Sequence, residues 1–128
     1  MRAMGIDIGT TTISVIVVDA ETGASLGTRT IAHEGFIEGH IPAARVQDPE
    51  KLWKFTEAAV CELMEECGKV DSIGLTGQMH GMMYVDAEGN AASPLYIWQD
   101  GSGNEKMEDG RTYAEALRAT GGAASTGF

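Results

Sequence analysis

The stretch "GIDIGTTTISVIVVD", residues 5–19, places a carboxylate between two glycines and sets three consecutive threonines before an apolar run. This pattern predicts a strand, a tight turn and a second strand. Glycines at positions 5 and 9 let the backbone approach a ligand closely, and successive N–H groups with threonine hydroxyls suit an anion. The stretch lacks the Lys-Ser/Thr of a Walker loop and the GxGxxG of a dinucleotide fold.

The residues around this hairpin predict an antiparallel meander. Turn residues at 21–23 follow the second strand, and residues 24–32 form a third run. Residues 13–18 are largely apolar on both faces, which is typical of a central strand covered on each side. Residues 33–47 show no sustained period, and we predict a long loop there.

The next segment carries clear helix signals. Asp48 can cap the first turn, Pro49 suits the first helical position, and Gly68 marks the end. We expect this helix to pack on the sheet, because its apolar side chains form a stripe: Leu52, Phe55, Ala59, Val60, Leu63, Met64 and Cys67.

The rest of the chain adds strands and a short helix. We predict strands at Val70–Thr76, Met82–Asp86 and Leu95–Trp98, followed by a helix that begins with a capping box of Thr112 and Glu115. A meander, a crossover helix and a further strand together favour an α/β fold of ribonuclease H-like type. Its mixed sheet is expected to be incomplete.

Composition limits the classes of function. The chain has 128 residues with 43% hydrophobic content, which is the size of one globular domain. Its net charge of −10 repels nucleic acid and anionic membranes, so we expect neither as a partner. Asp7 and Asp19 interrupt the apolar amino-terminal segment, which therefore does not read as a signal peptide. We predict a cytoplasmic protein.

Cysteines and histidines give no disulfide or zinc signal. Cys61 and Cys67 lie on different sides of the predicted helix, so they cannot pair with each other, and we expect buried reduced thiols. His33, His40 and His80 lack the close spacing that gathers zinc ligands, so we predict no zinc site.

Asp7 is the candidate metal ligand of the opening hairpin. It stands at the end of a strand with no neighbouring Lys or Arg, so it would hold Mg²⁺ directly or through water. Gly9, Thr10, Thr11 and Thr12 would line a phosphate-binding turn. The alternative is a surface turn with a capping Asp, since these are ordinary turn residues.

The stretch "TGQMHG", residues 76–81, lies just past an apolar strand, where α/β folds bind ligands. The amide of Gln78 and the ring of His80 suit carbohydrate hydroxyls, and Met79 could pack on the apolar face of a sugar. The alternatives are a core methionine and a structural histidine.

A third candidate lies in "YIWQDG", residues 96–101. Trp98 is an aromatic residue followed closely by Asp100, whose carboxylate could accept hydrogen bonds from vicinal hydroxyls. Asp100 could equally begin a Gly-rich turn, since "DGSGN" follows.

Taken together and in this order, the motifs resemble the FGGY carbohydrate kinase family. "GIDIGTTT" is similar to its first phosphate motif, "QDPEKLW" to the helix start after its early loop, "TGQMHG" to its sugar-contacting segment and "WQDG" to its Trp-x-Asp motif. The resemblance covers essentially the whole chain and is nearest to the xylulokinase and sedoheptulokinase branch.

The resemblance implies an ATP-dependent kinase that phosphorylates a hydroxyl of a xylulose-like or sedoheptulose-like ketose, with Mg²⁺ and two domains of the actin and sugar kinase type. Asp7 would serve metal and phosphate, Thr10–Thr12 would line the phosphate turn, and Met79, His80 and Asp100 would contact the sugar. In the family, the catalytic base lies later in the chain than the part that corresponds to Met1–Phe128. Residues 1–128 are therefore expected to be the first part of the N-terminal domain, inactive alone, without the C-terminal nucleotide domain.

Two residues depart from the family pattern. Ser14 and Ser102 stand where the family commonly has Lys or Arg, which puts phosphate or substrate contacts in doubt. Two hypotheses therefore remain. The chain is either part of a sugar kinase that binds a small-molecule sugar and ATP, with a homodimer as a candidate assembly, or a standalone or degenerate nucleotide- or sugar-binding module without kinase activity.

Overall fold

The computed structural model describes residues 1–122, which form two compact units. The first unit contains Met1–Gly35 and Pro49–Gln78, and the second contains Phe36–Asp48 and the described residues from Met79 onward. No helix in the described range is long and apolar enough to cross a membrane.

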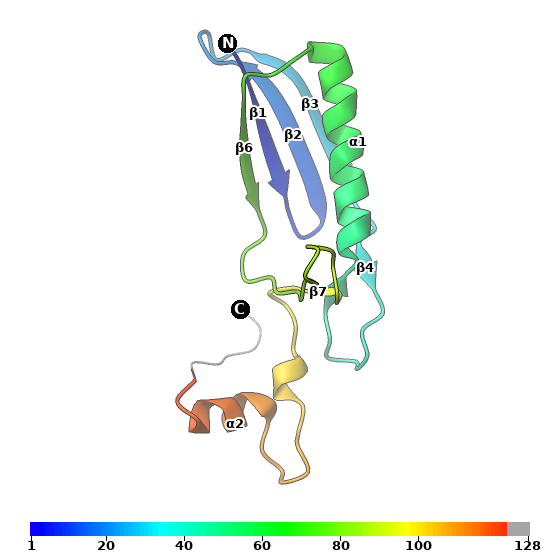
Figure 1. Cartoon of the computed structure of the whole chain (residues 1–128), viewed down its shortest axis with the longest axis vertical. Helices are drawn as coiled ribbons and strands as arrows, with labels where there is room; N and C mark the ends of the chain where they lie inside the picture. Colours follow the sequence, from blue (N-terminus) through cyan, green and yellow to red (C-terminus); the bar gives the residue numbers. More distant parts are fainter. Residues whose placement is uncertain (123–128) are drawn as a thin grey trace. The chain divides into compact units, whose positions relative to one another are not determined.

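The first unit is built on a four-stranded mixed sheet (Figure 1). The antiparallel meander predicted from the hairpin motif is confirmed, and the strand after the crossover helix pairs in parallel with the first strand. The order across the sheet is β3-β2-β1-β6. The strands are β1 (Arg2–Ile8), β2 (Thr12–Asp19), β3 (Ser25–Ala32) and β6 (Ser72–Gly77).

Helix α1 (Pro49–Cys67) packs on one face of β2 and β3. The approach is close, because a Cβ on Gly27 of β3 would lie 2.8 Å from the Leu63 Cδ2. Each large apolar side chain buried here contributes about 1.5–3 kcal/mol. The buried sheet residues on this side are Met4, Ile6, Ile13, Val15 and Val17.

The buried line of α1 differs from the predicted stripe. It runs through Leu52, Thr56, Ala59 and Leu63, while Met64 is 40% exposed. Thr56 is accommodated because its hydroxyl donates to the Leu52 carbonyl at 2.8 Å, within the helix itself. Residues spaced alternately four and three apart thus form the helix face that meets the sheet. A threonine can lie on this face when its hydroxyl is hydrogen-bonded within the helix.

The prediction that both cysteines are buried is wrong. Both thiols are free, but Cys61 is exposed and Cys67 is half-buried. Cys61 falls off the line of α1 that meets the sheet. Only Cys67 approaches β3, since a Cβ on Gly27 would lie 2.9 Å from its Sγ.

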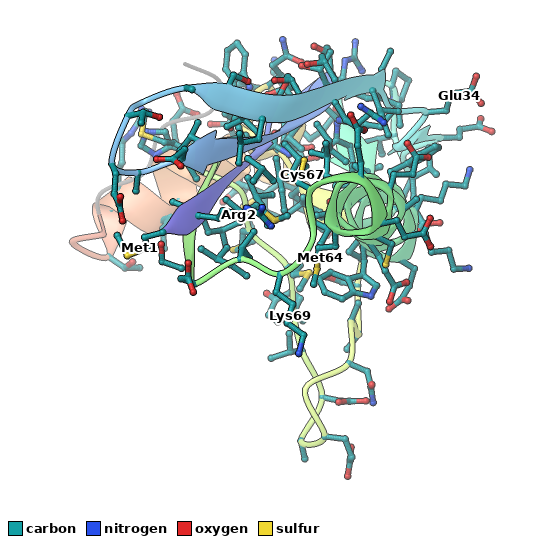
Figure 2. All side chains as sticks on the ribbon, turned by 90° about the horizontal axis from the view of Figure 1, so that it is seen from above. Met1, Arg2, Glu34, Met64, Cys67 and Lys69 are labelled. Carbon is teal, nitrogen blue, oxygen red and sulfur yellow. The ribbon has the colours of Figure 1, made fainter. Side chains whose placement is uncertain are left out.

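The carboxyl end of α1 is capped from β1. Gly68 has φ +76°, the left-handed conformation that glycine adopts without strain, as its position after the helix predicts. The last turn of α1 holds no basic residue, but the Arg2 guanidinium donates to the Cys67 carbonyl (Figure 2). A cation thus compensates the negative end of the helix dipole.

The expectation that β2 is covered on both sides is not met within the first unit. Its second face carries Ile16, which is 38% exposed, because the single helix of this unit lies on the other face. At the sheet edge, Ile73 and Leu75 of β6 are 61% and 72% exposed. They share the α1 side with Met4 and Ile6, their register partners, but α1 packs mainly on β2 and β3.

The second unit contains a small antiparallel sheet of order β4-β5-β7. Its strands are β4 (Phe36–Ile37), β5 (Val46–Gln47) and β7 (Leu95–Tyr96). The predicted loop 33–47 thus includes two short strands, whose two-residue length leaves no period to detect.

The strand predicted at Met82–Asp86 is not formed. Only isolated bridges occur there, Met82 with Tyr96 and Val85 with Ala91. Asp86 instead organises a turn by accepting from the Asn90 backbone N–H at 2.7 Å and from its side-chain amide at 3.0 Å. These bonds lower the pKa of Asp86.

The capping box is confirmed at α2 (Tyr113–Ala119), which follows the short helix η1 (Ser102–Asn104). The Thr112 hydroxyl accepts from the Glu115 N–H at 3.1 Å, and the Glu115 carboxylate accepts from the Thr112 N–H at 2.8 Å. These bonds with Thr112 lower the pKa of Glu115.

Candidate functional site

Asp7 lies in a row of polar side chains on the sheet face opposite α1. Its register partners are Ser14 on β2 and Thr76 on β6, and cross-strand partners project from the same face. Ser14 continues the row to Thr30 through a 3.1 Å hydrogen bond between their hydroxyls. Asp7 is exposed, and among the described residues its carboxylate has no hydrogen bond or ion pair. A carboxylate flanked by hydroxyls suits a hydrated cation.

A groove of about 620 Å³ runs along this face. Gly5 and Gly74 are neighbours in register, so the floor of the groove next to Asp7 carries no side chains. Ile16 forms part of its wall, and a Cβ on Gly5 would lie 3.2 Å from the Ile16 Cγ2. The polar row closes one end of this largely apolar groove.

The predicted phosphate turn connects β1 to β2. The Gly9 N–H donates to the Thr12 carbonyl at 2.9 Å, and a Cβ on Gly9 would lie only 2.9 Å from that same oxygen. Glycine is therefore needed for the closeness of the turn. Thr11 and Thr12 are exposed, and their hydroxyls form no hydrogen bond within residues 1–122. Both hydroxyls can therefore donate to an anion.

Gln78 joins the second motif to this turn. Its Oε1 accepts from the Thr10 hydroxyl at 3.1 Å, and its backbone N–H donates to the Ile8 carbonyl at 2.9 Å. Asp7, Gly9, Thr10–Thr12 and Gln78 are thus gathered at one end of the sheet. Gln78 here braces the turn predicted to bind phosphate, which is a role that its sequence position did not suggest.

Three residues of this end were missed in the sequence. The sequence marks Ser14 only as a position where the family commonly has a cation and Thr76 only as the end of a strand, and it excludes His33 as a zinc ligand without giving it another role. His33 is 6% exposed and its N–H donates to the Thr11 carbonyl at 3.1 Å. Strand register could have found all three, because Asp7 pairs with Ser14 and Thr76, and Thr12 pairs with Ala32.

In the second unit, Met79 and His80 begin an exposed segment. Met79 is 73% exposed, so the core reading of this methionine does not hold. His80 has φ +59° and is the non-glycine residue of positive φ in the described chain. Such a conformation costs about 1–2 kcal/mol, and these outliers concentrate at functional sites. Reciprocal N–H···O bonds of 2.8 Å between Met82 and Tyr96 tie the segment to β7.

Asp100 follows β7 and holds two loops together. Its carboxylate accepts from the Arg45 N–H at 2.9 Å, the Ser102 N–H at 3.0 Å and the Ser102 hydroxyl at 3.1 Å. The turn-forming alternative therefore describes Asp100 in this structure. A carboxylate has about four lone-pair sites, so Asp100 retains capacity for one more donor.

Comparison with known proteins decides the family. The protein-family model described as "FGGY family of carbohydrate kinases, N-terminal domain" matches residues 2–126 of the sequence. The chain belongs to the FGGY family. The ribonuclease H-like fold class is thereby confirmed together with the family resemblance seen in the motifs.

Relatives of this FGGY chain are named xylulose kinases. The chain is 32% identical over 100 residues to the one from Escherichia coli (strain K12), covering 77% of this chain and 20% of the relative. It is 31% identical over 99 residues to the one from Arthrobacter sp. (strain NRRL B3728), covering 75% and 91%. A solved structure described as a xyloylose kinase from Brucella ovis superposes with TM-score 0.77 at 26% identity, covering 94% of this chain and 24% of that one. The chain thus spans about a fifth of the length of the Escherichia coli relative, about a quarter of the Brucella ovis structure and most of the Arthrobacter relative.

Basic side chains are absent from the described groove beside the predicted phosphate turn. No Lys or Arg lines the groove, and on the α1 side of the sheet Arg29 is paired with Glu62 at 3.1 Å and Glu66 at 2.7 Å. The hydrogen bonds to these partners raise the pKa of Arg29, and Glu66 has the larger effect. The described residues contain no group of three or more His, Cys, Asp or Glu side chains placed to hold a metal. A cation at Asp7 would need phosphate oxygens and water as its other ligands.

Proposed function

We propose that this chain is the first part of the N-terminal domain of an ATP-dependent sugar kinase whose nucleotide domain and catalytic base lie in the remainder of the full-length protein. The observation that carries the proposal is Asp7, an exposed carboxylate without a protein partner in the described chain, beside a glycine-closed threonine turn. Membership of a carbohydrate kinase family supports the reaction class.

Asp7 is proposed to hold Mg²⁺, directly or through water. Mg²⁺ keeps several waters and is typically bound by one or two protein carboxylates with substrate phosphates, which fits a single carboxylate among hydroxyls. When bound, it would neutralise charge on the ATP phosphates. Gly9, Thr10, Thr11 and Thr12 are proposed to position the transferred phosphate through N–H and hydroxyl groups.

Gln78, Met79, His80 and Asp100 are proposed to contact the sugar. His80 offers a ring donor or acceptor and Asp100 a carboxylate, both suited to hydroxyls, while the exposed Met79 offers an apolar surface. The names of the relatives favour a xylulose-like ketose over a sedoheptulose-like one. Cytoplasmic location and a homodimer stay predictions from the sequence.

A binding module without kinase activity remains the second candidate. Ser14 favours it, because the family commonly has a Lys or Arg at this position. Here Ser14 instead forms a hydrogen bond with Thr30, and no Lys or Arg lines the groove. Loss of that cation would weaken the hold on a transferred phosphate.

A substrate panel separates these candidates. The full-length protein is incubated with MgATP and a series of pentuloses, heptuloses and polyols, and ADP release is followed. We expect one ketose, of the xylulose type, to stimulate ADP release well above the sugar-free rate. If none does, while the sugar binds in calorimetry, the kinase proposal is rejected in favour of the binding module.

A further inference from the structure

His33 is the first residue after β3 and lies against the threonine turn. It is 6% exposed, so its ring is removed from solvent, and it belongs to no group of three or more His, Cys, Asp or Glu side chains placed to hold a metal within the described residues. A buried polar ring is stable only when its nitrogens are hydrogen-bonded. The partners of those nitrogens therefore show what the ring does.

The two ring nitrogens of His33 have opposite roles. Nε2 lies 3.1 Å from the Gly9 carbonyl, and a carbonyl can only accept, so Nε2 carries the proton. Nδ1 accepts from the Gly35 N–H at 3.2 Å and is therefore unprotonated. The ring is the neutral tautomer with its proton on Nε2.

Packing holds this ring in place. A Cβ on Gly35 would lie 2.9 Å from Nδ1 and 2.8 Å from the Leu52 Cδ2, so only glycine leaves room for the ring beside α1. The ring is thus confined between the Gly35 backbone and the turn.

These bonds set the orientation of two peptide groups in the turn. The His33 ring holds the Gly9 carbonyl, and the His33 N–H holds the Thr11 carbonyl at 3.1 Å. In a trans peptide the N–H points opposite to the carbonyl. The N–H groups of Thr10 and Thr12 are therefore directed away from His33.

We propose that His33 is a positioning residue for the phosphate turn: its neutral ring fixes the peptide planes of Gly9 and Thr11, and with them the N–H groups that meet a phosphate. The identity of the ligand rests on the proposed kinase function. The arrangement of ring and turn does not.

Two substitutions separate positioning from simple stability. In His33→Gln the amide nitrogen takes the place of Nε2, which keeps donation to Gly9 and loses the acceptor for Gly35. In His33→Asn the amide oxygen takes the place of Nδ1, which keeps the acceptor and loses donation to Gly9. Each removes one hydrogen bond, so both should lower the melting temperature similarly. Glu34→Ala is the control, since Glu34 is exposed and its side chain points away from the sheet (Figure 2).

Kinetics of the full-length protein provide the first readout. His33→Asn should raise the KM for MgATP about threefold to tenfold, the size of one net hydrogen bond, while His33→Gln and Glu34→Ala leave it within about twofold. The KM for the sugar should stay unchanged in all three. An equal change of the MgATP KM in the Asn and Gln variants would overturn the proposal, as would no change in either.

Nuclear magnetic resonance of the 128-residue chain provides a readout that needs no activity. At neutral pH the ring ¹⁵N shifts should show a protonated Nε2 and a bare Nδ1, and the amide shifts of residues 9–12 should move in His33→Asn but not in His33→Gln. The opposite tautomer would reject the positioning role whatever the kinetics. If the Asn variant unfolds, Gly35→Ala, which crowds the ring from the other side, should move the same amides. A wild-type protein that releases no ADP would reject the kinase function and leave these shifts as the test of positioning.

Discussion

The Thr10 hydroxyl donates a hydrogen bond of 3.1 Å to the Oε1 of Gln78, although the two residues lie 68 positions apart in the chain. A second bond, from the Gln78 N–H to the Ile8 carbonyl at 2.9 Å, fastens the same two segments. The turn after β1 and the residue after β6 therefore form one structural element. A change in one of the two motifs should be felt in the other.

The Thr10–Gln78 bond should be measurable as a coupling energy. In a double-mutant cycle of Thr10→Val and Gln78→Ala, we expect a coupling of about 1 kcal/mol in the free energy of unfolding, because the bond is partly buried. Urea denaturation of the chain measures it. Additive effects of the two substitutions would show that the bond contributes nothing.

Asp7→Asn should abolish function without harming the fold. The carboxylate is exposed and has no partner in the described chain, so we expect the free energy of unfolding to change by less than about 0.5 kcal/mol. In the full-length protein, kcat should fall by about 100-fold or more if Asp7 holds the metal as proposed. Glu57→Gln on the exposed side of α1 is the charge-matched control. A large loss of stability with normal turnover would make Asp7 a structural capping residue.

His80→Gly should separate the ring from its strained backbone. Glycine adopts φ +59° without cost, so stability should stay level or rise, while the KM for the sugar rises several-fold in the full-length protein. His80→Asn, which also tolerates the left-handed region, serves as the matched variant. If glycine lowers stability and leaves the sugar response unchanged, His80 is a structural residue.

Acid should weaken α2 through Glu115. Its bonds to Thr112 lower its pKa below the ordinary value of 4.5, so the ionised form stabilises the folded cap. The contribution is fully present above about pH 4.5 and is lost as the pH falls through the lower folded pKa. In this acid range, we expect the Cα chemical shifts of residues 113–119, measured by nuclear magnetic resonance, to move from helical values toward those of an unfolded chain.

Glu115→Gln should keep the cap at every pH, because a neutral amide oxygen still accepts from Thr112. Glu108→Gln, at an exposed residue outside the box, should titrate like the wild type. An acid transition that survives in Glu115→Gln would assign it to another group.

The open edge of the sheet should make the 128-residue chain self-associate. β6 carries no charge and exposes Ile73 and Leu75, which is typical of a strand that pairs with another chain. Leu75→Lys should lower the average mass in analytical ultracentrifugation, whereas Ala58→Lys on exposed α1 adds the same charge and should not. Identical concentration dependence of both variants would locate association elsewhere.

Local sequence patterns predicted the fold well where the residues themselves determine the backbone conformation. The glycine-flanked hairpin, Gly68 after α1 and the box of Thr112 and Glu115 each carry their own conformational cause, and each was found in place. The parallel strand β6 followed from a crossover helix of sufficient length.

Patterns could not predict what depends on neighbours distant in sequence. The short strands β4 and β5 exist only through their pairing, so no local period marks them. Thr56 is buried because it satisfies its own hydroxyl, against the polar character of the residue. The partners of Asp7 and the ring of His33 follow from strand register, which the individual motifs do not contain.

The position of the proposed Mg²⁺ ion tests the assignment of Asp7 most directly. Crystals of the full-length protein with Mn²⁺, ADP and a xylulose-type ketose would locate the ion by its anomalous signal. We predict a peak about 2 Å from the Asp7 carboxylate, or about 4 Å if one water intervenes, with phosphate oxygens beside the turn at residues 9–12. An ion bound to the nucleotide but more than about 10 Å from Asp7, well beyond any single water bridge, would contradict the assignment.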